Sequence, residues 1–203
     1  MSSAPRLSLV KLKGFPSEFH PSGKIATVAF IESSNEVIEL LEKFGKLFSP
    51  VVMDMRGNVE SLLEYYKKDI TNREFLEDMI LTDAEKLSHP WLLWLKRALE
   101  LIERFFWYVI NNDDIIKEKS DSLKPMINQA YNEVLKPYHG WFLQNTFKLL
   151  YQWMPSRSTL LGSDLYFEDN IKHLKILMPR MRLHLDKIND LYLKHNLNDD
   201  RKV

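Results

Sequence analysis

Apolar residues recur every three or four positions along most of this chain, and no stretch alternates between apolar and polar positions for more than a few residues. The first pattern is typical of one face of an α-helix, whereas half-buried strands need the second. Only 6 of the 203 residues are glycine, which further disfavours β-sandwiches and barrels. The sequence therefore predicts a single all-α domain of about eight helices.

Prolines, capping residues and apolar periodicity divide the chain into segments. Residues 1–23 are expected to form an irregular N-terminal leader that packs on the body or frays, followed by one all-helical domain over residues 24–203. The helix over residues 90–110 is the most apolar and should be the central element, about 32 Å long. The predicted helices cover about residues 33–47 with a cap at 33–36, 49–68, 72–87, 90–110, 121–135, 139–153, 156–162 and 166–196 with a kink at Pro179.

Composition excludes several classes of function. The 28 basic and 28 acidic residues leave no net charge, so a protein that wraps nucleic acid is disfavoured. The absence of cysteine excludes disulfides, thiolate metal sites and a cysteine nucleophile. The N-terminal residues lack the apolar run of a signal peptide, and charges interrupt every later apolar run before the roughly 18 residues of a spanning helix. We expect a cytoplasmic, soluble protein.

Motifs for catalysis, cofactors and metals are missing. The chain has no Walker loop, dinucleotide fingerprint or nucleophile elbow, so no catalytic residue and no cofactor is predicted. His173 and His184 would share a helix face, but they would lie about 16 Å apart, too far to share a zinc ion. They are expected to be solvated surface residues, and no metal site is predicted.

Four polar or aromatic residues stand out from the apolar pattern. Asp54 and Asn58 are spaced i and i+4, so both side chains emerge on one face of a helix that is apolar around them. Trp94 lies in the most apolar predicted helix, and His139 precedes Gly140 at a helix start. Each also has an ordinary explanation. Asp54 could be an acid favoured near a helix N-terminus, and Asn58 a solvated amide beside it. Trp94 could be a packed indole, and His139 a helix cap.

Three segments carry these residues in order, at 48–58, 93–99 and 138–141, and together they resemble the glycolipid transfer protein family. The similarity extends from about residue 33 to the C-terminus. It implies a two-layer helical sandwich of eight helices that holds one sphingolipid, with the hydrocarbon chains inside and the head group on a surface patch.

The resemblance also implies roles for individual residues. Asp54 would bind the lipid amide N–H and a sugar hydroxyl, Asn58 another hydroxyl and His139 the amide carbonyl, while Trp94 would stack on the sugar. Ser61 stands where the family usually has a lysine, which puts one sugar contact and its charge in question.

A sugar head group is favoured over phosphate. Family members that carry ceramide phosphate have a lysine in place of Asn58 and arginines in place of Trp94 and Ala98, and this chain has none of the three. Arg56 would face away from Asp54. Arg97, about 60° around the helix from Trp94, keeps the ceramide phosphate alternative open.

The predicted function is that of a cofactor-free, non-enzymatic and monomeric carrier of glycosphingolipids that touches membranes transiently. A lipid sensor or adaptor that docks a partner protein is the alternative, and a hydrolase using Asp54 and His139 is disfavoured because no nucleophile accompanies them. Trp141 and Phe142 are expected to dock on the membrane. The residues expected to line the apolar tunnel are Phe44, Leu47, Val52, Met55, Leu101, Phe105, Phe147 and Tyr151.

Overall fold

The computed structural model describes residues 5–82, 90–117 and 119–203, and its regular structure there is helical apart from one isolated bridge between Ala26 and Phe75. The predicted all-α class is thus confirmed, with nine α-helices in these residues where about eight were expected. The elements are η1 (Leu9–Lys11), α1 (Thr27–Glu42), η2 (Lys46–Phe48), α2 (Ser49–Lys67), α3 (Leu76–Thr82), α4 (Pro90–Asn111), α5 (Asp113–Ile116), α6 (Lys124–Val134), α7 (Trp141–Gln152), α8 (Arg157–Leu161) and α9 (Asp164–Lys194).

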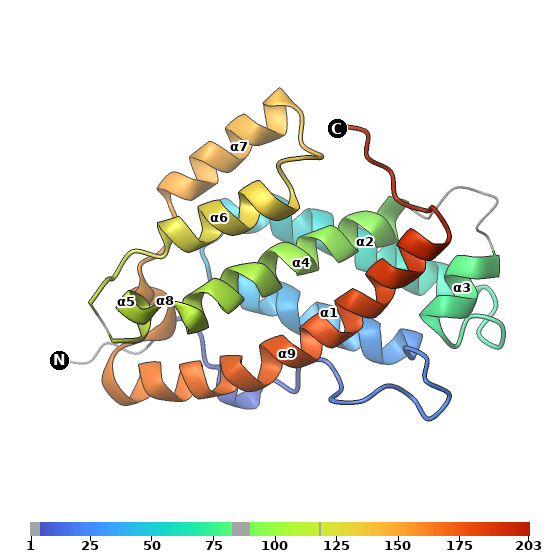
Figure 1. The fold of residues 1–203 in the computed structure, drawn as a ribbon, viewed down its shortest axis with the longest axis horizontal. Coiled ribbons are helices and arrows are strands. Elements are labelled where there is room, and N and C mark those ends of the chain that lie inside the picture. Colours follow the sequence, from blue (N-terminus) through green and yellow to red (C-terminus); the bar gives the residue numbers. More distant parts are fainter. Residues whose placement is uncertain (1–4, 83–89, 118) are drawn as a thin grey trace.

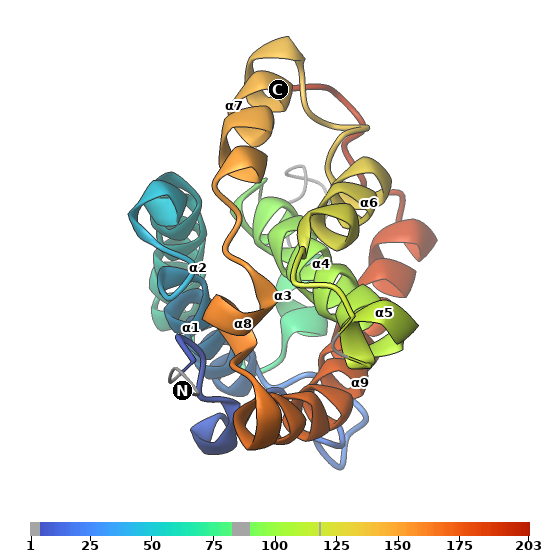
Figure 2. The ribbon, with the colours of Figure 1, turned by 90° about the vertical axis from the view of Figure 1, so that its left-hand side faces the viewer.

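Helix α4 is the central element, as predicted. It contacts α2, α6 and α9, and α1 packs in turn on α2 (Figure 1). Figure 2 shows α1 and α2 as one layer beside a second layer formed by α4, α6 and α9. The fold is therefore the expected two-layer helical arrangement, and none of the helices in the described ranges is both long enough and apolar enough to cross a membrane.

The described part of the N-terminal leader packs on α9. Leu7, Leu9 and Phe15 are buried. The side chain of Asn170 accepts a hydrogen bond from the backbone N–H of Leu9 (3.1 Å) and donates one to the carbonyl of Leu7 (3.2 Å). The polar backbone of this irregular segment is thereby satisfied inside the protein.

The start of the first long helix was predicted wrongly. Helix α1 begins at Thr27 rather than at residue 33, and Ser33 and Ser34 lie inside it instead of capping it. Their hydroxyls donate to the backbone carbonyls four residues earlier, at 2.8 and 2.7 Å. Serine can satisfy either arrangement, so the sequence alone does not distinguish them. The helix also ends earlier than expected, before Gly45, whose φ of 122° no helix accommodates.

One further helix boundary and one additional short helix differ from the prediction. Helix α3 begins at Leu76 rather than near residue 72, and its expected end at residue 87 lies outside the described residues. Helix α4 ends at Asn111 as expected, and Asn112 then caps the short helix α5, which was not predicted, by accepting from the N–H of Ile115 (3.0 Å). Pro179 lies within α9, and Figure 1 shows this helix changing direction part-way along.

His184 is not the solvated residue that was expected. It is buried, with its ring 5.4 Å from that of Phe15 and 5.1 Å from that of Phe19. The sequence could not show this, because the two phenylalanines come from the N-terminal leader. His173 is half-buried, and its Nδ1 lies 2.8 Å from the carbonyl oxygen of Asp169.

Candidate functional site

Asp54 and Asn58 occupy successive turns of α2, beside the buried stripe that includes Met55 and Val59. The amide nitrogen of Asn58 donates to the Asp54 carboxylate at 3.2 Å. The surrounding protein takes part of this carboxylate out of water, which raises the pKa of Asp54 above 3.8, while the bond from Asn58 acts in the opposite sense. The pair therefore presents an oriented hydrogen-bond acceptor beside an amide at the protein surface.

The other polar residues of this part of α2 are already engaged. The Ser61 hydroxyl donates to the carbonyl of Gly57 at 2.9 Å, which ties it to its own helix. Arg56 forms an ion pair with Glu42 of α1, so its charge is already matched by that carboxylate. Neither residue supplies a positive charge next to the Asp54 carboxylate.

Trp94 and His139 come together although they lie on separate elements. Both are half-buried, and their rings are 6.0 Å apart at an angle of 31°. Burial, followed by the charge of Arg97, lowers the pKa of His139 below 6.5, so its ring is neutral at neutral pH. The hydroxyl of Tyr131 lies 3.2 Å from His139 Nδ1. When this hydroxyl donates to Nδ1, the single proton of the neutral ring is on Nε2. The Nε2–H can then donate to an acceptor such as an amide carbonyl.

Arg97 lies beneath the Trp94 indole rather than on the surface. It is only 2% exposed, and its guanidinium lies 3.4 Å from the ring centroid of Tyr138 and 5.1 Å from that of Trp94. Its Nη2 donates to the backbone carbonyl of Asp199 at 2.7 Å. Arg97 thus connects the Trp94 region with the C-terminal segment.

The C-terminal segment is fixed along the 138–140 motif. The N–H of Val203 donates to the carbonyl of Tyr138 (3.0 Å), and the N–H of Gly140 donates to the Val203 oxygen (2.7 Å). A Cβ atom on Gly140 would lie 2.9 Å from that oxygen, so this close approach requires glycine. The sequence analysis included Tyr138 in the third motif without giving it a role, and it missed the C-terminal segment. Tyr131 was also missed, because α6 ends at Val134 and no helical spacing relates Tyr131 to His139.

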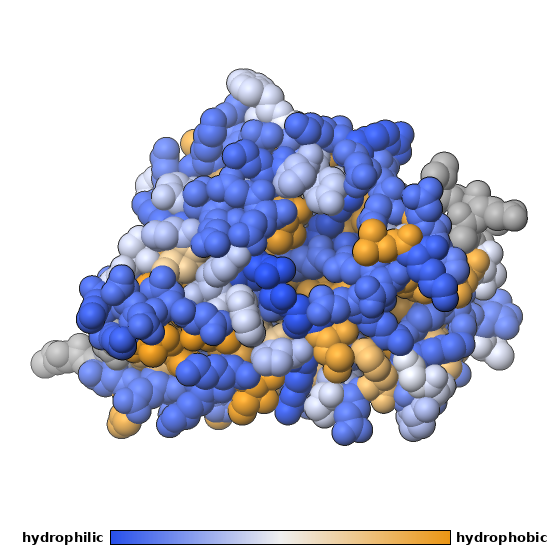
Figure 3. Space-filling model, viewed as in Figure 1, coloured by the Kyte–Doolittle hydropathy of each residue, from blue (hydrophilic) through white to orange (hydrophobic). Residues whose placement is uncertain are grey.

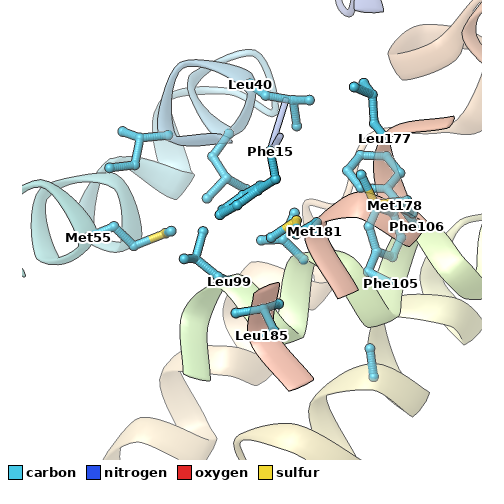
Figure 4. Close-up of a cluster of buried hydrophobic side chains, with 14 of the residues drawn as sticks. Phe15, Leu40, Met55, Leu99, Phe105, Phe106, Leu177, Met178, Met181 and Leu185 are labelled. Atoms are coloured by element: carbon cyan, nitrogen blue, oxygen red, sulfur yellow. The ribbon is translucent and has the colours of Figure 1, made fainter. Parts of the chain in front are cut away.

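The residues expected to line a tunnel mostly lie in the interior, but they are packed together. The Phe44 ring is 6.1 Å from that of Phe105, and Phe147 stacks on Tyr131 at 3.5 Å. Figure 4 shows buried side chains from several helices filling the same interior. Leu47 departs from the others because it is 50% exposed. Of the remaining predicted residues, those that are buried are Phe44, Val52, Met55 and Phe105, and those that are partly buried are Leu101, Phe147 and Tyr151.

Helix α7 exposes large apolar side chains to solvent. None of its residues is buried, and Trp141 and Phe142 are 80% and 72% exposed. Leu149 and Trp153, toward its other end, are also exposed. Exposed aromatic residues of this kind are suited to the boundary between water and acyl chains.

Comparison with family profiles identifies the family to which this chain belongs. The profile described as Glycolipid transfer protein (GLTP) matches residues 25–163, more than half of the chain. The chain belongs to the glycolipid transfer protein family. The resemblance seen in the three motifs is therefore confirmed.

Two curated relatives show how the chain compares in length. Human pleckstrin homology domain-containing family A member 8 is 29% identical over 200 residues, which cover 88% of this chain but 37% of that protein. The chain thus spans little more than a third of that relative's length. The glycolipid transfer protein of Danio rerio is 25% identical over 198 residues, covering 89% of this chain and 92% of that protein.

Two solved structures share the fold. One concerns how FAPP2 selects simple glycosphingolipids using the GLTP-fold; its TM-score is 0.81 at 24% identity, with 98% of this chain and 97% of that chain covered. The other is human ceramide-1-phosphate transfer protein in complex with 12:0 ceramide-1-phosphate, with a TM-score of 0.81 at 18% identity, covering 94% and 97%. These identities show a common fold and leave the head group open.

The glycolipid transfer protein fold places the two pairs of candidate residues on neighbouring elements. Asp54 and Asn58 lie on α2, which packs on α4, the helix that carries Trp94. A carboxylate, an amide, an imidazole and an indole face can together bind hydroxyls and an amide. Among the described residues, no group of three or more histidines, aspartates or glutamates is placed to hold a metal ion.

Acid is expected to destabilise the protein through two histidines that the fold removes partly or fully from water, His139 and His184. The pKa values of His139 and His184 both lie below the 6.5 of an unfolded chain. As pH falls below 6.5, the unfolded chain binds more protons, so stability falls until the pH has passed the lower folded pKa values. His139→Gln should therefore reduce the drop in Tm between pH 7.5 and 5 measured by circular dichroism. An unchanged drop in Tm in this variant would contradict the contribution of the lowered His139 pKa to acid sensitivity.

Proposed function

We propose that this protein is a non-enzymatic carrier that binds one glycosphingolipid and transfers it between membranes. The observation that supports the proposal is that the Asp54–Asn58 contact lies on α2, which packs on α4, and that Trp94 of α4 pairs with His139. The first pair would bind the lipid amide N–H and sugar hydroxyls. The second would stack on the sugar and donate to the amide carbonyl.

The charge distribution supports a sugar rather than a phosphate head group. A phosphate removed from water needs cations to replace its hydration. At this site Arg56 is paired with Glu42, Ser61 replaces a lysine, and Trp94 stands where carriers of ceramide phosphate have arginine. Arg97, the cation beneath Trp94, is buried against Tyr138 and donates to the carbonyl of Asp199. Ceramide phosphate is the alternative head group.

Selection of the lipid would come from the head-group site and not from the hydrocarbon chains. Each buried methylene contributes about 0.8 kcal/mol, so two long chains amount to more than roughly 20 kcal/mol, and spontaneous desorption into water is very slow. An apolar interior offers the chains nearly the same environment as the bilayer. Burial of the chains therefore permits transfer, and hydrogen bonds at the head group decide which lipid is carried.

Entry of a hydrocarbon chain would require the packed interior side chains to move apart in this proposal. The stacked rings of Tyr131 and Phe147, which join α6 to α7, would separate when a chain enters. The protein would act as a monomer in the cytoplasm, without a cofactor, and contact membranes only briefly.

Transfer between vesicles tests this function directly. Fluorescent glucosylceramide should move from donor to acceptor vesicles at a rate proportional to protein concentration, and ceramide phosphate should move more slowly. Tight binding of glucosylceramide with negligible transfer would instead favour a lipid sensor or adaptor. A hydrolysis product found by mass spectrometry would favour an enzyme.

Membrane docking is expected to depend on Trp141. Removing this exposed indole by Trp141→Ala should weaken partitioning onto vesicles by about tenfold, which corresponds to about 1.4 kcal/mol, and should slow transfer. Sedimentation with vesicles measures the partitioning. Leu165→Ala on α9, where the side chain is 75% exposed, is the matched control and should change neither quantity. Unchanged partitioning of Trp141→Ala would exclude this docking surface.

A further inference from the structure

Tyr131 lies on the inner side of α6, where it contacts both the candidate head-group site and the apolar interior. Its side chain is only 4% exposed, whereas the face of α6 that Figure 3 shows carries mostly hydrophilic side chains. The hydroxyl lies 3.2 Å from Nδ1 of His139. The ring stacks on Phe147 of α7, with the two ring centroids 3.5 Å apart and an angle of 4° between the planes. One buried residue therefore joins a candidate head-group residue to a predicted tunnel residue.

The backbone of His139 is fixed independently of Tyr131. Its N–H donates to the carbonyl of Leu135 at 3.1 Å, and its carbonyl accepts from the side chain of Gln144 on α7 at 2.8 Å. The imidazole can still rotate about its side-chain bonds, and a half-turn exchanges the positions of its nitrogen and carbon atoms. Hydrogen bonds decide between the two orientations of such a ring. Among the described residues, the Tyr131 hydroxyl is the only hydrogen-bond partner of the His139 ring.

The Tyr131 hydroxyl is suited to be the donor in this contact. Burial raises the pKa of Tyr131 to about 12, so the hydroxyl keeps its proton at physiological pH. Its only hydrogen bond to the described residues is the one with His139 Nδ1, and a buried hydroxyl proton without an acceptor is costly. Burial also lowers the pKa of His139, which keeps the ring neutral at neutral pH and leaves Nδ1 able to accept.

The stack on Phe147 and the contact with His139 use different parts of Tyr131. Phe147 covers a face of the ring and restricts its rotation, whereas the hydroxyl lies at the edge of the ring. A hydrocarbon chain that displaces Phe147 therefore need not break the bond to His139. Entry of a chain and orientation of the head-group residue can occur at the same tyrosine.

We propose that Tyr131 is a positioning residue that makes the protein select lipids with an amide carbonyl. The inference rests on the proposed function, in which His139 donates to that carbonyl. By donating to Nδ1, the Tyr131 hydroxyl sets the orientation of the His139 ring and the position of its single proton, so that Nε2–H is the group presented to the lipid. A lipid with a free amine in place of the amide has no carbonyl to accept this bond and gains nothing from the arrangement.

Two glycolipids that differ at this group test the selection. Glucosylceramide carries the amide carbonyl, and glucosylsphingosine carries the same sugar beside a free amine. Tyr131→Phe removes only the hydroxyl and keeps the stack. In calorimetry it should weaken glucosylceramide binding about fivefold, as expected for one hydrogen bond, and change glucosylsphingosine binding by less than about twofold. Tyr108→Phe, which removes a hydroxyl that donates to Glu133, is the matched control and should change neither.

A double variant tests whether Tyr131 acts through His139. When His139→Gln is already present, Tyr131→Phe should cause no further loss of glucosylceramide affinity, because the ring that it positions is absent. Full additivity of the two losses would show that Tyr131 acts independently of His139. Equal losses for the two lipids in Tyr131→Phe would show a general structural role. Either result would overturn the proposal.

Nitrogen NMR of the lipid-free protein at pH 7.5 gives a readout that does not depend on any lipid. In the wild type, the His139 ring should carry its proton on Nε2 and accept at Nδ1. In Tyr131→Phe, the Nδ1 resonance should move toward that of a nitrogen without a hydrogen bond. A proton on Nδ1 in the wild type, or an unchanged resonance in the variant, contradicts the positioning role. If the wild type binds neither lipid, the proposed function fails, and NMR still decides whether Tyr131 positions His139.

Discussion

Asp54→Val is expected to reduce the rate of glycosphingolipid transfer about a hundredfold. The carboxylate would accept hydrogen bonds from the lipid amide and a sugar hydroxyl, and a hydrogen bond to a charged group contributes about 1.5–3 kcal/mol. Valine has a similar shape and cannot accept either bond. The initial rate of fluorescent glucosylceramide transfer between vesicles measures the effect.

Folding should not suffer from this change. Desolvation raises the pKa of Asp54, so its charge does not favour the folded state, and its one side-chain hydrogen-bond partner among the described residues is Asn58. We therefore expect an unchanged or slightly higher Tm. Glu60→Val, an exposed acid on the same helix, is the control and should transfer at the wild-type rate. Normal transfer by Asp54→Val would remove Asp54 from the site.

Trp94→Ala should slow transfer about thirtyfold. The sugar would lose the aromatic face that its apolar side covers, and loss of a buried aromatic contact of this size costs about 2 kcal/mol. The change also removes the ring beside His139 and the indole over Arg97. The initial rate of glucosylceramide transfer between vesicles measures the effect. Calorimetry of glucosylceramide binding to the wild type and to the variant measures the underlying loss of affinity.

Two further variants distinguish a sugar-stacking role of Trp94 from a general effect on α4. Trp94→Phe keeps an aromatic face and should recover much of the affinity. Trp107→Ala removes another half-exposed tryptophan of the same helix, where it faces Arg182, and should leave glucosylceramide binding intact. Equal losses in Trp94→Ala and Trp107→Ala would indicate a general effect on α4 and not a sugar-stacking role.

The fold was predictable because helical periodicity is a local property of the sequence. Helix α4 was placed within one residue at both ends by Pro90 and by the polar residues after Ile110. The start of α1 was not, because Ser33 hydrogen-bonds equally well inside a helix. His184 was misjudged because the rings that bury it come from about 165 residues earlier in the chain.

In the candidate site, too, contacts between residues close in sequence were predictable, and contacts between distant residues were not. The spacing of Asp54 and Asn58 predicts their contact directly, since i and i+4 residues adjoin on a helix. The approach of His139 to Trp94 was suggested only by the family resemblance. The burial of Arg97 against Tyr138 and the tail was not predictable, because these contacts join residues 41 and 102 positions apart.

Native mass spectrometry of the protein isolated from cells would test the central claim most directly. The account predicts one bound lipid per chain, with the intact mass of a ceramide that carries a neutral sugar. Recovery of ceramide phosphate, of a lipid without an amide, or of a cleaved glycolipid would contradict it.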